Sequence, residues 1–484
     1  MITSKSGNVT GGTAVKGRRM TVIVFSLFFS WFLAFPFEGR ILYEITDFYG
    51  IEAQTLLLGA MAAHFTGLIV CGFFVRNIHA AKRLILLSIA FCAAGTGVFF
   101  SPPGVLWTVA LFVSAFLVGC CVAAWGHYFK GCTPRDELMK TMADCLIFTN
   151  ILMIMLNLSA IYLSPQIGLG FSVLVLAAAF PAALRLPGSV TVEARADAPS
   201  ADREAVSGVK LGALAFLCLF IVIITITSGL MYQVVNHSYD HLEWLTSWYW
   251  AAPYIAALFA MRSLPRKMNR SLMLYAAIAM IGFSFIAFLL LGRSWGDYLT
   301  VNTLMLGACG VYDLFWWSVL GEMMYLFRNP ARIIGIGLSA NVLGVLLGKL
   351  IGNAVPNGQS NGPALLALGV VCASLVMLPI LHGLLSRLLK NHVYLTALLE
   401  IPGREQAERI DGLHITDRLT ENERKVMLLL IRGKTYKTIA EELFISVNTV
   451  GTHVRNIYSK TGVRNKAELI YLIFNKENQF HQNN

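Results

Sequence analysis

Four polar residues near the C-terminus recur at helical spacing, on what would be one exposed face: Asn448, Thr452, Arg455 and Ser459. An arginine on such a face can donate two hydrogen bonds to the edge of a guanine, and a threonine can contact a base or the methyl group of a thymine. Thr449 and Lys437 occupy positions where the phosphates of a DNA backbone would pass. These residue types at this spacing predict a surface that recognises double-stranded DNA.

Short helices must position this polar stripe, and the sequence indicates where they begin and end. Thr420 and Glu423 form a capping box, in which a hydroxyl and a carboxylate bind free amides at a helix start. Gly433 ends this first of four helices, Thr435 and Ser446 begin the second and third, Gly462 ends the third, and the fourth begins near Asn465. The second and third of these helices, joined by a tight turn, form a helix-turn-helix, whose second helix enters a major groove. Residues at spacings of four, three and four predict the inward face of that helix: Val450, Val454, Ile457 and Thr461.

The stretch LTENERKVMLLLIRGKTYKTIAEELFISVNTVGTHVRNIYSKTGVRNKAELI resembles the LuxR-type helix-turn-helix domain. The matching residues are Leu419, Thr420, Glu423, Arg424, Gly433, Ile439, Ala440, Leu443, Ile445, Ser446, Thr449, Val450, His453, Asn456, Ile457, Lys460, Val463 and Asn465. The resemblance implies double-stranded DNA as partner and a homodimer formed through the last helix, here about 465–474. Members of the family commonly carry a DNA-contacting lysine where this chain has Gly451. A small helical domain that binds protein instead of DNA is the alternative interpretation.

The rest of the chain has the composition of a membrane protein. Hydrophobic residues make up 56% and charged residues 13%, with a mean hydropathy of +0.64, and so few charges cannot cover the surface of a soluble protein. Twelve apolar segments are long enough, or nearly so, to cross roughly 30 Å of hydrocarbon. They fall at about 20–37, 53–75, 84–101, 105–128, 141–163, 167–185, 211–235, 245–261, 271–291, 298–326, 333–354 and 364–386.

Lysine and arginine predict the orientation of these segments. The net charge is +11, and nearly all basic residues of the connecting loops fall on one side, whereas Arg40 and Arg293 fall on the other. By the positive-inside bias, both termini are expected in the cytoplasm and the helix count is even. The polar, basic residues 1–19 precede a first helix that we expect to be retained, because no cleavage pattern follows it. The predicted location is the inner (plasma) membrane.

A polar stretch at 186–210 divides the twelve segments into halves of six, 20–185 and 211–390. This topology resembles that of the major facilitator superfamily. In the family's loop motif, Gly72 and the basic end at Lys82 and Arg83 are present, but Arg76 and His79 replace an acidic residue and a glycine. That departure argues against a working transport cycle. A connector (391–415), the DNA-binding domain (416–476) and a disordered tail (477–484) are expected to follow.

Polar groups inside hydrocarbon are costly and are therefore candidates for function. The candidate effector-binding residues are Tyr312, Asp313 and Trp316 in the tenth segment, Tyr232 and Gln233 in the seventh, and His64 in the second. If helices 1, 4, 7 and 10 line a cavity, as the resemblance implies, these residues suit a small, partly apolar or aromatic molecule. Interfacial aromatic belts and ordinary contacts between helices remain the alternative.

No catalytic, metal or cofactor site is predicted. The nine cysteines include no CxxC pair, and the chain has no G-x-S-x-G, Walker or H-E-x-x-H motif. The predicted fold is all-α: a polytopic bundle of about twelve transmembrane helices, followed by a four-helix LuxR-type domain. The predicted function is a one-component, membrane-embedded transcription regulator that senses a small molecule. The alternatives are a facilitator-type transporter with a regulatory DNA-binding tail, and a bundle that serves only as an anchor.

Overall fold

The computed structural model describes residues 7–37, 39–188, 203–263, 270–354, 361–400, 419–431, 434, 436–463, 465, 466, 468, 469 and 472. All regular secondary structure in these ranges is helical. The chain divides into two compact units, residues 1–194 with 214–381 and residues 195–213 with 382–484. Residues 189–202 of the predicted linker and the tail 477–484 lie outside the described residues. The last part of that linker, 203–210, is helical, because α8 begins at Arg203.

Six of the seven helices in the first half match the predicted apolar segments. The helices are α1 (Gly7–Ala34), α2 (Arg40–Phe48), α3 (Ala53–Phe74), α4 (Ile78–Gly97), α5 (Val105–Cys132), α6 (Leu138–Tyr162) and α7 (Pro165–Leu184). The additional helix is α2, which is short and amphipathic and buries Ile41, Leu42 and Ile45. We predicted no helix there, because nine residues are too few to form a spanning segment.

The second half has a less regular beginning. Its elements are α8 (Arg203–Leu230), the π-helical turn η3 (Met231–Val235), η4 (His237–Leu242), α9 (Glu243–Thr246), α10 (Ala251–Ser263), α11 (Arg270–Leu290), α12 (Trp295–Met323), α13 (Pro330–Ala354) and α14 (Asn361–Glu400). The predicted segment 245–261 is therefore interrupted: α10 begins only at Ala251. Pro253 lies in the first turn of α10, where the missing amide is tolerated.

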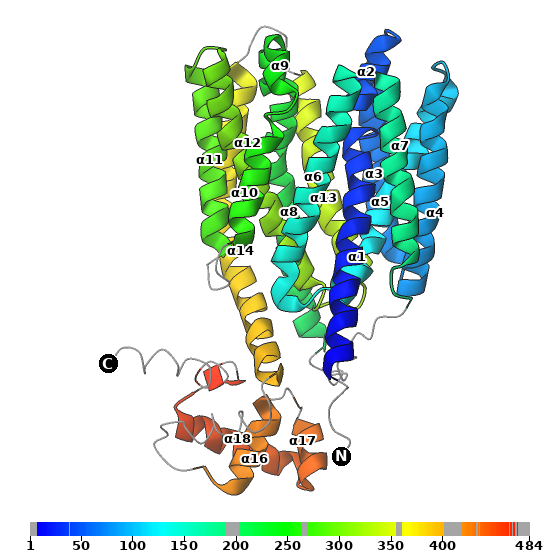
Figure 1. Cartoon of the computed structure of the whole chain (residues 1–484). Helices are drawn as coiled ribbons and strands as arrows, with labels where there is room; N and C mark the ends of the chain where they lie inside the picture. The colour runs from blue at the N-terminus through cyan, green and yellow to red at the C-terminus, as the bar shows by residue number, and fades with distance from the viewer. Residues whose placement is uncertain are drawn as a thin grey trace. The chain divides into compact units, whose positions relative to one another are not determined.

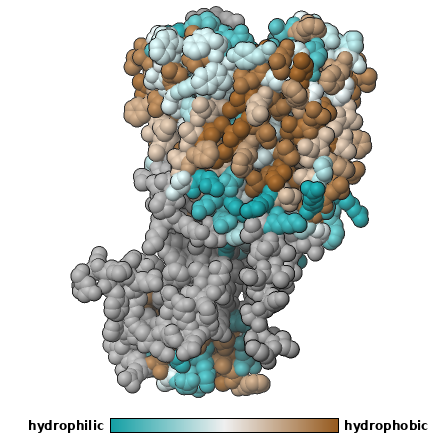
Figure 2. Space-filling view, viewed as in Figure 1, coloured by the Kyte–Doolittle hydropathy of each residue, from teal (hydrophilic) through white to brown (hydrophobic). Residues whose placement is uncertain are grey.

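Ten helices in the described part of the chain are long and apolar enough to cross a membrane. The other two predicted segments correspond to α10, with 13 residues, and to the shorter apolar stretch Leu274–Leu290 of α11. Hydrophobic side chains cover the middle of the bundle face in Figure 2, with hydrophilic side chains toward both ends of the helices. The membrane bundle is confirmed, and its helices run side by side (Figure 1).

Ionic contacts join the halves at the end of the bundle where most basic residues lie. Asp144 on α6 accepts hydrogen bonds from Arg262 on α10 (2.6 Å) and from Arg18 on α1 (3.0 Å). Arg18 also donates to Thr141 at 2.7 Å and forms an ion pair with Glu137 at 3.3 Å. A single carboxylate thus connects two helices of the first half to one of the second. We call Asp144, Arg18 and Arg262 the Asp144 junction.

Backbone carbonyls complete the connection at this end. The amide of Asn329 donates to the carbonyls of Gly72 (2.8 Å) and Val75 (3.0 Å), and Lys130 donates to that of Met324 (2.8 Å). The loop after Gly72 is the one that departs from the facilitator motif. Its contact with the second half uses main-chain acceptors, which need no acidic side chain.

The opposite end of the bundle is also closed by polar contacts. Arg40 on α2 donates to Glu243 on α9 at 2.6 Å, and Gln54 on α3 donates to Asn353 on α13 at 2.9 Å. Both pairs are exposed, so each contributes little on its own. Polar contacts therefore link the halves at both ends.

The C-terminal unit contains the predicted helix-turn-helix. Its helices are α16 (Glu421–Ile431), α17 (Tyr436–Leu443) and α18 (Val447–Thr461), and Lys466, Glu468, Leu469 and Leu472 are also helical (Figure 1). The buried core comprises Val426, Met427, Leu430, Ile431, Ile439, Ala440, Val450, Val454, Ile457 and Leu469. Gly433 and Thr435, two of the predicted boundary residues, lie outside the described residues.

Candidate nucleic-acid interface and effector site

Capping residues fix both ends of α18. Ser446 accepts a hydrogen bond from the backbone amide of Thr449 at 3.0 Å, and the two hydroxyls lie 2.8 Å apart. At the other end Gly462 has φ +68°, a left-handed conformation that favours glycine. Since Val450, Val454 and Ile457 are buried, the rotation of α18 about its axis is also fixed.

The opposite face of α18 carries the predicted polar stripe. Asn448, Thr452, Arg455 and Ser459 are all exposed. The hydroxyl of Thr452 donates to the carbonyl of Asn448 at 3.1 Å, and Arg455 forms no ion pair among the described residues. An exposed face of this kind can present side chains to base edges in a major groove.

The two predicted phosphate-contacting residues have different surroundings. Thr449 is half-buried, and its hydroxyl is already engaged with Ser446. This contact supports the cap that Ser446 provides at the start of α18. Lys437 belongs to α17, but its side chain lies outside the described residues.

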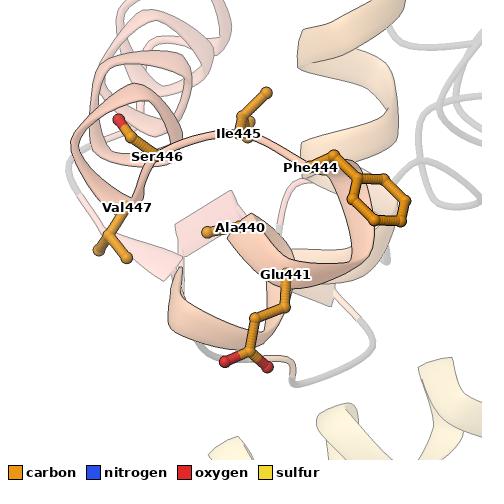
Figure 3. Close-up of a pocket in the computed structure, with 6 residues that line it drawn as sticks. All are labelled: Ala440, Glu441, Phe444, Ile445, Ser446 and Val447. Atoms are coloured by element: carbon orange, nitrogen blue, oxygen red, sulfur yellow. The ribbon is translucent and has the colours of Figure 1, made fainter.

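The turn between α17 and α18 contains a residue that the sequence reasoning missed. Phe444 has φ +56° and is 95% exposed, and it lies beside a shallow hollow lined by Ala440, Glu441, Ile445, Ser446 and Val447 (Figure 3). A bulky residue rarely adopts a positive φ. The conformation lets the chain reverse within three residues, and the amide of Ile445 then donates to the carbonyl of Ala440 at 3.0 Å.

A buried ion pair ties the first helix of the domain to the reading helix. Glu423 accepts hydrogen bonds from the amide of Thr420 at 2.8 Å and from the ammonium of Lys460 at 2.9 Å. The Thr420 hydroxyl accepts from the amide of Glu423 at 3.3 Å, which confirms the capping box. Burial by itself would raise the pKa of Glu423, but the bonds from Lys460 and Thr420 outweigh it and lower that pKa below its usual value. The sequence predicted the box but not its partner Lys460.

Gly451 offers a test of the reading face. A Cβ atom at this position would meet nothing within 4 Å, so a lysine fits without strain. We expect Gly451→Lys to stabilise α18 by about 1 kcal/mol through helix propensity and to tighten DNA binding about three- to tenfold through one phosphate contact. Fluorescence anisotropy with duplexes from upstream of the gene measures the affinity.

Gly451→Ala is the matched control, because it restores helix propensity without adding charge. If Gly451→Ala and Gly451→Lys bind DNA equally tightly, position 451 does not face a phosphate.

In the membrane unit, Asp313 is the centre of the predicted effector residues. Its carboxylate accepts hydrogen bonds from the Tyr254 hydroxyl (3.0 Å) and from the Trp316 indole nitrogen (3.1 Å). Tyr312 faces α8, where its hydroxyl lies 2.6 Å from that of Ser228. The structure thus brings Asp313 and Trp316 together and adds Tyr254, which sequence reasoning did not select.

Tyr232 and Gln233 lie in the π-helical turn η3. Such turns are frequent at functional sites. The ammonium of Lys349 lies 5.6 Å from the centre of the Tyr232 ring, and a Cβ at Gly352 would meet the Gln233 side chain at 2.8 Å. Both predicted residues therefore pack against α13, which does not carry Asp313.

His64 is not a partner of Asp313. Its ring lies 4.6 Å from that of Phe32 and 5.5 Å from that of Phe37, and its Nδ1 lies 3.3 Å from the carbonyl oxygen of Ala115. His64 contacts Phe32 on α1 and Ala115 on α5, whereas Asp313 binds Tyr254 on α10 and Trp316 on its own helix. The structure therefore does not bring these two candidate residues together, since residues at similar depth in a bundle need not face each other.

A cluster of aromatic rings connects the two halves near Asp313. Trp317 stacks on Trp316 with centroids 5.1 Å apart, and it meets Phe25 on α1 (5.9 Å) and Trp125 on α5 (6.3 Å) edge-on. Phe25 and Trp125 are 4.5 Å apart. We call Phe25, Trp125, Trp316 and Trp317 the aromatic bridge. Phe25 and Trp125 were missed because aromatic residues are common in all of these helices.

Comparison with known proteins identifies the C-terminal domain. Residues 417–473 match the model of bacterial regulatory proteins, luxR family. Spore germination protein GerE of Bacillus subtilis is 46% identical over 52 residues, which are 11% of this chain and 70% of that protein. Transcriptional regulatory protein LiaR of Bacillus subtilis is 46% identical over 50 residues, 10% of this chain and 24% of that protein. Through this domain the chain belongs to the luxR family of bacterial regulatory proteins.

The match covers only part of several relatives. The monoamine regulon transcriptional regulator of Klebsiella aerogenes is 40% identical over 73 residues, 15% of this chain and 31% of that protein. The chain thus spans a quarter to a third of the length of this protein and of LiaR. The likeness is confined to the DNA-binding end.

The membrane unit has the fold of major facilitator transporters. The human organic anion transporter MFSD10 aligns with a TM-score of 0.54 and 15% identity, over 77% of this chain and 99% of that one. A bacterial homologue of the iron transporter ferroportin in an outward-facing state aligns with a TM-score of 0.58 and 12% identity, over 76% of this chain and 99% of that one. The fucose:proton symporter FucP of E. coli aligns with a TM-score of 0.53 and 16% identity, over 76% of this chain and 98% of that one. The matched proteins are regulators and transporters, not enzymes.

Proposed function

We propose that this chain is a membrane-embedded one-component transcription regulator. The observation that carries the proposal is one polypeptide with a facilitator-fold bundle and a luxR-family domain whose reading face is exposed. The basic loops support cytoplasmic termini and an inner-membrane location, which would place the domain on the side of the DNA. The proposed domain division is 20–390 for the bundle, 391–415 for the connector and 416–476 for the DNA-binding domain.

The partner of the C-terminal domain is double-stranded DNA. Asn448, Thr452, Arg455 and Ser459 are the proposed base-reading residues, and Lys437 and Thr449 are the proposed phosphate contacts. A homodimer through the last helix would place two such faces on paired half-sites.

The effector is a small molecule bound in the membrane bundle. We place its site at Asp313, Trp316 and Tyr312 on α12, with Tyr232 and Gln233 in the turn η3 that follows α8. Ligand shifts an equilibrium only through different affinities for two states, and the polar contacts between the halves are groups that can differ between states. The Asp144 junction is the most extensive of these contacts.

Asp144→Asn tests whether the bundle controls the DNA-binding domain. The substitution removes the charge that holds Arg18 and Arg262, so we expect the output of a promoter reporter to change at least about threefold at equal protein level, in the absence of any effector. Immunoblots and size-exclusion profiles verify amount and folding. Arg262→Gln is the second variant, since it opens the junction between the halves but keeps the pair of Arg18 with Asp144.

Asp47→Asn is the matched control, because it removes one carboxylate charge from an exposed position on α2. If both junction variants leave the reporter unchanged, the bundle is an anchor.

The facilitator fold also supports a second candidate, a transporter with a regulatory DNA-binding tail. Counterflow in proteoliposomes separates the two functions. Saturable, substrate-specific exchange would favour transport, and its absence together with a reporter response to Asp144→Asn would favour the regulator.

A further inference from the structure

Asp313 differs from Asp144 and Asp297, two other carboxylates of the spanning helices. Asp144 is held by two arginines, and Asp297 caps the start of α12 through Ser294. Asp313 lies ten residues from Met323, about 15 Å along the helix axis, and both of its hydrogen-bond donors are uncharged. Among the described residues no basic side chain pairs with it. A carboxylate at this depth is costly unless a cation compensates it.

The surroundings of Asp313 suit a cation with an apolar body. Tyr254 and Trp316 bind the carboxylate directly, and Trp317 stacks on Trp316 with an interplanar angle of 19°. Aromatic faces attract cations through the negative electrostatic potential of the ring, most strongly where water is excluded. The site therefore combines one negative group with neighbouring aromatic rings.

Part of this site is accessible. Asp313 and Tyr254 are half-buried, whereas Tyr312, Leu314 and Trp316 are buried. An anionic ligand would be repelled by the carboxylate, and an uncharged ligand would leave it without a counter-ion. Anionic and uncharged ligands are therefore both disfavoured at this site.

We infer that the effector is a small organic cation, a quaternary or protonated amine with an aromatic or apolar body, whose charge lies against Asp313. This inference rests on the effector site proposed above and specifies its ligand class. The same geometry assigns Tyr254 and Trp316 a positioning role: their donors hold the carboxylate in place at the edges of the two rings.

Two probes of equal shape test the inference on the purified full chain in detergent at pH 7. They are 3-hydroxyphenyltrimethylammonium, which carries a permanent charge, and 3-tert-butylphenol, which replaces its nitrogen by carbon. We expect isothermal titration to show at least about tenfold tighter binding of the cation, as a desolvated cation–aromatic and carboxylate contact predicts. Asp313→Asn should abolish that preference, and Asp47→Asn should keep it.

Tyr254→Phe is a second variant that tests the inference even if the Asp313 variant misfolds. It keeps the charge and removes one donor, so we expect a smaller loss of cation binding, about two- to fivefold, with an unchanged size-exclusion profile. The inference is overturned if the cation fails to bind, if both probes bind equally, or if Asp313→Asn retains the preference.

Binding is measured without DNA, so the result is independent of the regulator proposal. A reporter response to Asp144→Asn without cation binding would leave the regulator standing and remove the ligand class. Cation binding without any reporter response would support the ligand class and remove the proposed regulation.

Discussion

Replacing Glu423 with alanine is expected to destabilise the DNA-binding domain by roughly 3 kcal/mol. The carboxylate is 3% exposed, and its partner Lys460 is 23% exposed. Removing Glu423 takes away a buried counter-ion of Lys460, and loss of the helix cap adds about 1 kcal/mol. The free energy of unfolding of a domain of this size is only a few kcal/mol, so we expect a large unfolded fraction of the variant. Hydrogen–deuterium exchange of α16 and α18 in the full chain measures the effect.

The pH dependence follows from the sign of the shift. The pKa of Glu423 is lower in the folded domain than in the unfolded chain, so its contribution is complete above the usual glutamate pKa of about 4.3. It is lost as the pH falls through the lower folded value. The difference between the native chain and Glu423→Ala should therefore narrow in acid.

Glu423→Gln separates charge from capping, since an amide can still serve in a capping box. It should remove most of the pH dependence and retain part of the stability. Glu421→Ala is the matched control, because that glutamate is 68% exposed and its pair with Lys425 spans 3.7 Å. Equal exchange rates in Glu423→Ala and Glu421→Ala would contradict the structural role of the buried pair.

Replacing Arg455 with alanine is expected to weaken specific DNA binding about tenfold to a hundredfold without unfolding the domain. The side chain is exposed on the reading face and forms no ion pair within the described residues. A bidentate contact from an arginine to guanine contributes about 1–3 kcal/mol of discrimination. Fluorescence anisotropy with the upstream duplex, and with a scrambled duplex of equal length, measures affinity and specificity together.

Arg455→Lys distinguishes base reading from phosphate contact. A lysine retains the charge but cannot make the planar two-bond contact, so we expect affinity for the scrambled duplex to be preserved and specificity to be reduced. Lys425→Ala is the control for charge, because Lys425 is 52% exposed on α16, away from the polar stripe. Full recovery of specificity in Arg455→Lys would show that position 455 contacts only the backbone.

The glycines of α13 illustrate what packing adds to a pattern. Gly344 and Gly348 recur four residues apart, and in the structure a Cβ at either position would lie within 2.4 Å of a carbonyl on α8. The spacing marks a possible contact face, but it does not identify the partner helix. Only the assembled bundle shows that the partner is α8.

The sequence by itself determined the elements that depend on neighbours along the chain. The transmembrane segments follow from the length of the apolar runs. The capping box follows from two residues three positions apart. The reading face follows from helical periodicity, because it lies opposite Val450, Val454 and Ile457. The luxR-family domain was predictable because its signals all lie within about 55 residues.

The tertiary structure decided every contact between residues distant in sequence. Lys460 pairs with Glu423 across 37 residues, Arg262 reaches Asp144 across 118, and Tyr254 binds Asp313 across 59. Periodicity gives the face of a helix but not the helix that covers it. For that reason Asp313 was predictable as a candidate, whereas its real partners, and the exclusion of His64, depended on how the helices pack.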